Sequence, residues 1–165
     1  MITEKKIRIL YVLIFLASCL FASNKIDSLE KVLKQNLSDT ERVKTLSKLC
    51  WEYNDYNPKK ALEYGNKALE LAKQIGFKKG EAMAYNNMGS AYSGQGDYEM
   101  MMEYYKKGLE LRKELGDSTS IGVSMNNVGL AYNSRSEYSK SIKYFMDAMS
   151  IFEKTRDKKI WRWFL

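Results

Sequence analysis

Residues 84–98, AYNNMGSAYSGQGDY, return 40 residues later as SMNNVGLAYNSRSEY at 124–138. Both stretches hold a pair of asparagines, then a glycine, then alanine and tyrosine, at the same spacing. Residues 41–80 belong to the same series, but their first half matches at a shift of 39, so their inner turn is expected to be one residue shorter. A period of this length is typical of a stacked array, whose units bury their apolar faces only against their neighbours.

Each unit reads as two helices with a break between them. In the second unit apolar residues recur at three- and four-residue steps, which is the spacing of one helix face. A break with two glycines follows at 93–97, where Asp97 suits an N-cap, and Gly116 suits the left-handed end of the next helix. The third unit repeats this, with helices expected at about 120–133 and from Glu137 to about Thr155. The predicted fold is all-α, with three helical hairpins over 38–80, 81–120 and 121–160.

The first unit carries its own start signals. Ser38 and Glu41 have the spacing of a capping box, and Asn57-Pro58 places an N-cap before a proline that can open the second helix. Residues 23–37 precede this unit and are expected to form a short helix that covers the N-terminal end of the array. Its apolar face consists of Ile26, Leu29, Val32, Leu33 and Leu37.

Small residues occupy corresponding positions of the units. Gly89 and Gly129 lie inside the first helices, where glycine costs up to about 1 kcal/mol relative to alanine. Two copies that keep it indicate a close crossing of helices. Cys50 falls on the same position of the first unit and is expected to be a small buried residue. In the second helices the small residues are Ala61, Ala68, Gly108 and Ala148.

Composition argues against several functional classes. The chain has no histidine, which removes the commonest general base and metal ligand, and its two cysteines lie far apart. We therefore expect no metal, no cofactor and no enzymatic activity. The net charge of +7 is modest, and lysines alternate with glutamates on helix surfaces, which does not favour a nucleic-acid-binding face.

The spacing within the units resembles the tetratricopeptide repeat. In the second and third units it reads Met88-Gly89-x-x-Tyr92, Met101, Tyr105, Gly108 and Val128-Gly129-x-x-Tyr132, Ser141, Phe145, Ala148. The first unit is looser, with Leu49-Cys50-x-x-Tyr53, Ala61, Gly65, Ala68. This resemblance implies a right-handed α-solenoid that binds proteins or peptides. The 40-residue period resembles the kinesin-light-chain-like branch, and the whole arrangement resembles the extracytoplasmic part of bacterial sensor histidine kinases.

The N-terminal segment 1–22 reads as an export signal. Basic residues precede an apolar stretch of about 14 residues, which suits a signal peptide and is short for a membrane span. Cys19 closes a Leu-Ala-Ser-Cys string that resembles a lipobox, so lipidation of Cys19 competes with cleavage near Ala22 or Ser23. The protein is expected to be exported to the periplasm or outer surface, with membrane contact only through this segment.

The first helices of such an array line a concave groove. Asparagine donates and accepts hydrogen bonds, so a row of asparagines can hold the backbone of a peptide ligand, and an exposed tryptophan can anchor it. Alternatively, Asn87 and Asn127 only bond neighbouring helices. The candidate peptide-binding residues are Lys44, Ser47, Trp51, Asn86, Ser90, Asn126 and Asn133.

The C-terminal end leaves three alternatives open. Residues 161–165 read as the start of an incomplete fourth unit, and the last complete helix is expected to expose an apolar flank. In the first alternative, the C-terminal tail folds back and caps this flank. In the second, the flank mediates self-association. In the third, the chain is a fragment of a longer histidine kinase or regulator. The expected function is a non-catalytic binding scaffold, either the sensory or adaptor part of an envelope signalling system or a stand-alone exported lipoprotein or adaptor. The flank is predicted to comprise Ile142, Met146, Met149 and Phe152.

Overall fold

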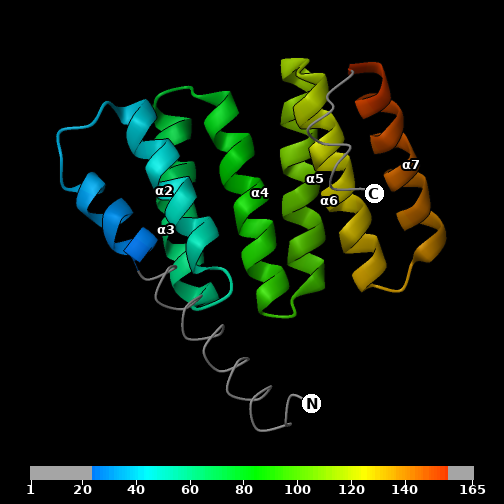
Figure 1. Cartoon of the computed structure of the whole chain (residues 1–165), viewed down its shortest axis with the longest axis horizontal. Coiled ribbons are helices and arrows are strands. Elements are labelled where there is room, and N and C mark those ends of the chain that lie inside the picture. The colour runs from blue at the N-terminus through cyan, green and yellow to red at the C-terminus, as the bar shows by residue number, and fades with distance from the viewer. Residues whose placement is uncertain (1–23, 156–165) are drawn as a thin grey trace, which may run out of the picture.

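The computed structural model describes residues 24–155, and every regular element in that range is a helix. A short helix over 24–33 is followed by six longer ones, arranged side by side in a curved row (Figure 1). The predicted all-α repeat architecture is thereby confirmed. The helices are α2 (Asp39–Tyr53), α3 (Pro58–Gln74), α4 (Lys78–Gly94), α5 (Tyr98–Leu115), α6 (Ser118–Ser134) and α7 (Tyr138–Thr155).

The six helices form three hairpins, α2 with α3, α4 with α5 and α6 with α7. The start of α4 lies 39 residues after that of α2 (78 − 39), whereas α5 starts 40 residues after α3 (98 − 58). The first unit is therefore one residue shorter between its helix starts, as the sequence predicts. Spacing between units is uneven, because α2 packs directly on α4 while α4 and α6 are joined mainly through α5.

The predicted helix ends are confirmed by their hydrogen bonds. Ser38 Oγ accepts from the backbone N–H of Glu41 at 3.3 Å and donates to the Glu41 carboxylate at 3.0 Å. Asn57 Oδ1 caps α3 ahead of Pro58, and Asp97 Oδ1 caps α5. Each bond satisfies a backbone donor that the first helical turn leaves unpaired. These local bonds fix where each helix begins.

The N-terminal helix is held against the first hairpin by a polar cluster around Glu30. Tyr53 and Tyr64 donate their hydroxyls to Glu30 Oε1 at 2.8 and 2.9 Å, and Lys60 Nζ lies 3.2 Å from the same oxygen. The hydrogen bonds from Tyr53 and Tyr64 lower the pKa of Glu30 below its ordinary value. Leu33 packs beside these contacts against the core around Leu46. The segment thus covers the end of the array, but its helix ends at residue 33 rather than at the predicted 37.

Replacing Glu30 with glutamine is expected to lower the melting temperature at pH 7 and to have little effect at pH 3. A carboxyl whose pKa is lowered by folding stabilises the protein above its unfolded pKa, and that contribution is lost as the pH falls through the folded value, below about 4.5. The difference should be only a few tenths of a kcal/mol, because the cluster is partly exposed to solvent. Thermal unfolding at both pH values measures it, with exposed Glu63→Gln as the control. An equal loss at both pH values would contradict the prediction.

Small residues of one helix face large residues of the next. A Cβ atom at Gly89 would lie 2.5 Å from Cδ1 of Tyr105, and one at Gly129 would lie 2.7 Å from Cε1 of Phe145. The predicted close crossings are therefore confirmed, and an aromatic ring occupies each of them.

At the corresponding crossing of the first unit, the larger residue lies on the first helix and glycine lies on the second. Cys50, fully buried, stands at the glycine position and Gly65 at the ring position. The space above Gly65 is filled by the side chain of Met88 from the next unit, with Cys50 Sγ 3.0 Å from where a Cβ would lie. Burial raises the pKa of the Cys50 thiol to about 12, so the thiol stays protonated near neutral pH and acts as a packing residue, as predicted.

The outer face of α7 carries an apolar flank. Ile142, Met146 and Met149 are exposed by 58, 64 and 37%, as predicted. The prediction for Phe152 is wrong, since its ring is buried against α6, where a Cβ at Gly122 would lie 2.6 Å from Cε1. Phe152 follows Ala148 by four residues and therefore shares its inward face rather than the flank.

None of the helices within 24–155 has the length and hydropathy needed to cross a membrane. The predictions on 1–22, including lipidation at Cys19, and on 161–165 lie outside the described residues.

Candidate functional site

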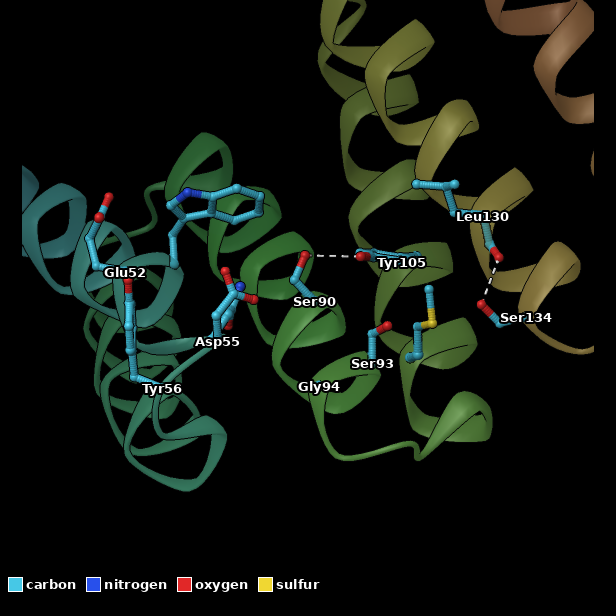
Figure 2. A pocket seen from close by; sticks show the side chains of 12 residues that line it. Glu52, Asp55, Tyr56, Ser90, Ser93, Gly94, Tyr105, Leu130 and Ser134 are labelled. Atoms are coloured by element: carbon cyan, nitrogen blue, oxygen red, sulfur yellow. Dashed lines mark hydrogen bonds between the residues drawn. The ribbon is translucent and has the colours of Figure 1, made fainter. Parts of the chain in front are cut away.

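A hollow opens between the C-terminal ends of α2, α4 and α6, with the start of α5 behind it. Its volume is about 480 Å³. Figure 2 shows Glu52, Asp55 and Tyr56 on the α2 side, Ser90 and Ser93 on α4, and Leu130 and Ser134 across from them on α6. We call it the Trp51 hollow, lined by Trp51, Glu52, Asn54, Asp55, Tyr56, Ser90, Ser93, Gly94, Met101, Tyr105, Leu130 and Ser134.

Exposed aromatic and apolar groups form much of this lining. Trp51 and Tyr56 are 54 and 52% exposed and Leu130 is 43% exposed, which is unusual for side chains of this size. Tyr105 closes the back of the hollow, where its hydroxyl lies 2.9 Å from Ser90 Oγ (Figure 2). The hollow therefore offers a concave apolar surface with polar groups at defined places, as ligand sites commonly do.

Asn54 is the one lining side chain with an unmet hydrogen-bonding need among the described residues. It is only 7% exposed, and its Oδ1 atom accepts no hydrogen bond from any residue of 24–155. A buried acceptor without a donor costs about 1–3 kcal/mol, so such groups call for an explanation. The oxygen has almost no accessible surface, so a donor in the hollow would supply the missing bond once the Asn54 side chain turns toward it.

Only some of the predicted groove residues line the Trp51 hollow. Trp51 and Ser90 line the hollow, whereas Lys44, Asn126 and Asn133 are not among its lining residues. Ser47 is fully buried, so its placement on the open groove surface is a wrong prediction. The reason is the tight packing of α4 on α2, which covers the middle of α2 and leaves only its C-terminal end open.

The asparagine pairs link neighbouring units. Asn87 Nδ2 donates to the backbone carbonyl of Ser47 at 2.7 Å, and Asn127 Nδ2 donates to Asn86 Oδ1 at 2.6 Å. The predicted alternative, that Asn87 and Asn127 bond a neighbouring helix, is confirmed. The side-chain oxygen of Asn86 is therefore already bonded to α6. This link lies midway along α4 and α6.

A second hollow lies at the opposite ends of the same helices, between the starts of α4 and α6 and the end of α5. Its volume is about 380 Å³, and Lys79, Met83, Arg112 and Asp117 are among its lining residues. Arg112 donates to Ser124 Oγ at 2.6 Å and to the Ser120 carbonyl at 3.2 Å, and burial lowers its pKa. We call it the Arg112 hollow. Two of its three charged lining residues are basic, whereas both charged residues of the Trp51 hollow are acidic.

The fold shifts the pKa of Tyr105, at the back of the Trp51 hollow, away from neutrality. Burial raises the pKa of Tyr105 above its ordinary value, and the hydrogen bond from Ser90 opposes this shift. A general acid or base needs a pKa near the working pH, and this shift moves Tyr105 further from neutrality. Within 24–155 no three Asp, Glu or Cys side chains come together in a way that could hold a metal ion. The absence of catalysis and of cofactors stays a prediction.

The repeat pattern of the sequence does not indicate several residues that line the Trp51 hollow. Asp55 and Tyr56 lie in the turn after α2, and Met101 and Tyr105 come from a second helix, so none belongs to a stripe along the first helices. The available signal is the one-residue deletion in this turn, which places Asp55 and Tyr56 differently from their counterparts in the other units.

Comparisons with known proteins agree with this architecture. A family model for the tetratricopeptide repeat matches residues 52–114 and 80–154. No curated protein matches. Among solved structures, the TPR domain of Arabidopsis FLU is similar with a TM-score of 0.64 and 19% identity, over 71% of this chain and 99% of that one.

Two longer bacterial chains are similar as well. Aspartyl phosphate phosphatase F from Bacillus subtilis has a TM-score of 0.71 and 18% identity, over 82% of this chain and 39% of its own. A Rap protein complexed with competence and sporulation factor has a TM-score of 0.71 and 19% identity, over 82% of this chain and 40% of its own. The present chain thus spans less than half of either, and identities this low show the fold alone. Because the family model covers more than half of its length, the chain belongs to the tetratricopeptide repeat family.

Proposed function

We propose that this protein is a non-catalytic scaffold that binds a peptide segment of another protein along the concave side of its first helices. The observation that carries the proposal is the Trp51 hollow, where Trp51, Tyr56 and Leu130 are exposed together around a concave surface. Aromatic side chains in a partly enclosed pocket are the groups that contribute most to binding energy at protein interfaces. Family membership supports the same role, and a structural neighbour is complexed with competence and sporulation factor.

Leu130→Arg is expected to weaken peptide binding at least tenfold, because a long charged side chain would enter the hollow from its α6 side. A tenfold change corresponds to about 1.4 kcal/mol, less than a single interface hot spot contributes. Peptides selected from a displayed random library against the full chain serve as probes, and titration calorimetry measures their affinity.

Ile142→Arg is the matched control, since it makes the same kind of change on the exposed flank of α7, away from the hollow. Selected peptides should bind this variant as they bind the unmodified chain. Peptides that lose affinity for Ile142→Arg and keep it for Leu130→Arg would place the binding surface elsewhere and remove the proposal.

The cellular setting we propose is an envelope signalling system, in which the array is the sensory or adaptor part. Support comes from the export-type segment 1–22, which lies outside the described residues, and from the resemblance to the repeat regions of sensor histidine kinases. A stand-alone exported lipoprotein is the alternative. Mass spectrometry of the membrane fraction separates lipidation at Cys19 from simple cleavage, which would give an unmodified N-terminus at Ser23 or Asn24.

A further inference from the structure

We infer that the Trp51 hollow recognises a cationic side chain of its ligand, with arginine the preferred residue. The inference rests on the proposed function and names the chemistry that the scaffold selects. None of the twelve described residues lining the hollow is a lysine or an arginine, although the chain as a whole carries a net charge of +7. Its two charged residues, Glu52 and Asp55, are both carboxylates.

The two carboxylates differ in their availability. Glu52 is 2.6 Å from Lys25 Nζ of the N-terminal helix and is largely covered, so its charge is already compensated. Asp55 is exposed and forms no ion pair with any residue of 24–155. The hollow therefore holds one uncompensated negative charge at its α2 side, where Figure 2 shows Asp55 between Tyr56 and Ser90.

Asn54 is the second and independent observation. Its side chain lines the hollow, is more than nine-tenths buried, and has an acceptor oxygen with no donor among the described residues. A guanidinium group has five N–H donors in one plane and no acceptor, so it can donate to the exposed Asp55 carboxylate and, once the Asn54 side chain turns toward the hollow, to the Asn54 oxygen as well. Arginine is favoured over lysine because its planar and more weakly hydrated guanidinium group can bond a carboxylate through two parallel hydrogen bonds and also stack on aromatic rings.

The aromatic lining suits the same ligand. A cation over an indole or phenol ring is attracted by the ring within about 6 Å of its centre, and guanidinium groups also stack flat on such rings. Trp51 and Tyr56 are half exposed and line the same hollow as Asp55, while Leu130 and Met101 offer an apolar wall for the aliphatic part of an arginine. The Asp55 charge, the Asn54 acceptor oxygen and the two aromatic rings therefore all favour an arginine side chain.

The opposite hollow supplies the contrast. The Arg112 hollow carries Lys79 and Arg112, so a cationic group has no reason to bind there. Binding of a cation is therefore expected at one end of α4 and not at the other.

Acetyl-arginine amide and acetyl-citrulline amide are the probes, because citrulline has nearly the same shape without the charge. Each is titrated into the full ¹⁵N-labelled chain, and the Trp51 indole N–H and the backbone amides of 51–56 are followed by NMR. Arginine amide should shift these signals with about two- to fivefold higher affinity than citrulline amide, the gain that one charge pair gives at a partly exposed site. Equal affinities, or shifts confined to the Arg112 hollow, would overturn the inference.

Asp55→Asn is expected to remove most of the preference for arginine over citrulline. Asp39→Asn alters an exposed carboxylate in the first turn of α2, at the end of that helix far from Asp55, and should leave the preference unchanged. Asp55 is exposed and bonded to no described side chain, so its replacement should not unfold the array. An Asp55→Asn variant that keeps the full preference would contradict the inference.

The peptide library separates this inference from the proposed function. Selected peptides rich in arginine that shift the 51–56 amides support both. Peptides without basic residues that still shift these amides leave the scaffold standing and remove the cation preference. A selection that yields no peptide acting on these amides removes both.

Discussion

Gly89→Ala is expected to destabilise the second unit by about 1–3 kcal/mol, although alanine is the better helix former. A methyl group at this position would lie 2.5 and 2.6 Å from two carbons of the Tyr105 ring. The ring has little room to move, because Tyr105 is buried and its hydroxyl is bonded to Ser90. Chemical denaturation of the full chain, followed by circular dichroism, measures the loss.

Ser139→Ala tests whether helix propensity alone explains the result. Ser139 is exposed on α7, so alanine there should be neutral or slightly stabilising. In a Tyr105→Leu background the cost of Gly89→Ala should fall by at least about 0.5 kcal/mol, because the clashing ring atoms are gone. A Gly89→Ala variant as stable as the unmodified chain would show that the close crossing does not require glycine.

Phe152→Ala is expected to cost about 3–5 kcal/mol and to loosen only the last hairpin. The ring is 2% exposed and fills the space that Gly122 leaves open on α6. In a linear array each unit contacts only its neighbours, so the loss should not spread evenly along the chain. Hydrogen exchange is therefore expected to accelerate at the amides of α6 and α7 and to change little in α2 and α3.

Ile142→Ala on the same helix provides the comparison. Its side chain is 58% exposed, and substitutions at such positions usually change stability by less than about 0.5 kcal/mol. Faster exchange spread equally over all hairpins of Phe152→Ala would show that the array unfolds as a single cooperative unit.

Features governed by local rules were predictable from the sequence. The caps at Ser38, Asn57 and Asp97 depend on contacts with residues three positions further on, and all three form. The left-handed helix end at Gly116, with φ of 70°, likewise needs only the residue itself. The 40-residue period adds the repetition of these signals, which is enough to specify hairpins and their order.

Features that depend on distances between units were not predictable. The period treats the three first helices as equivalent, whereas α4 covers Ser47 of α2 and the α4–α6 contact leaves the Trp51 hollow open. Side-chain sizes at contacts between units contribute to that difference, as where Met88 of the second unit fills the space over Gly65 of the first. No single position reveals it, so the predicted asparagine stripe and the hollow overlap only in part.

The exchange of sizes around Gly65 also restricts how such a protein can be shuffled in evolution or engineering. The space above Gly65 is filled by Met88 of the following unit, and the third unit has the smaller Val128 at that position. Removing the second unit and joining the first directly to the third would leave that space partly empty. A variant that keeps the first two units together is therefore expected to pack better than one that joins the first unit to the third.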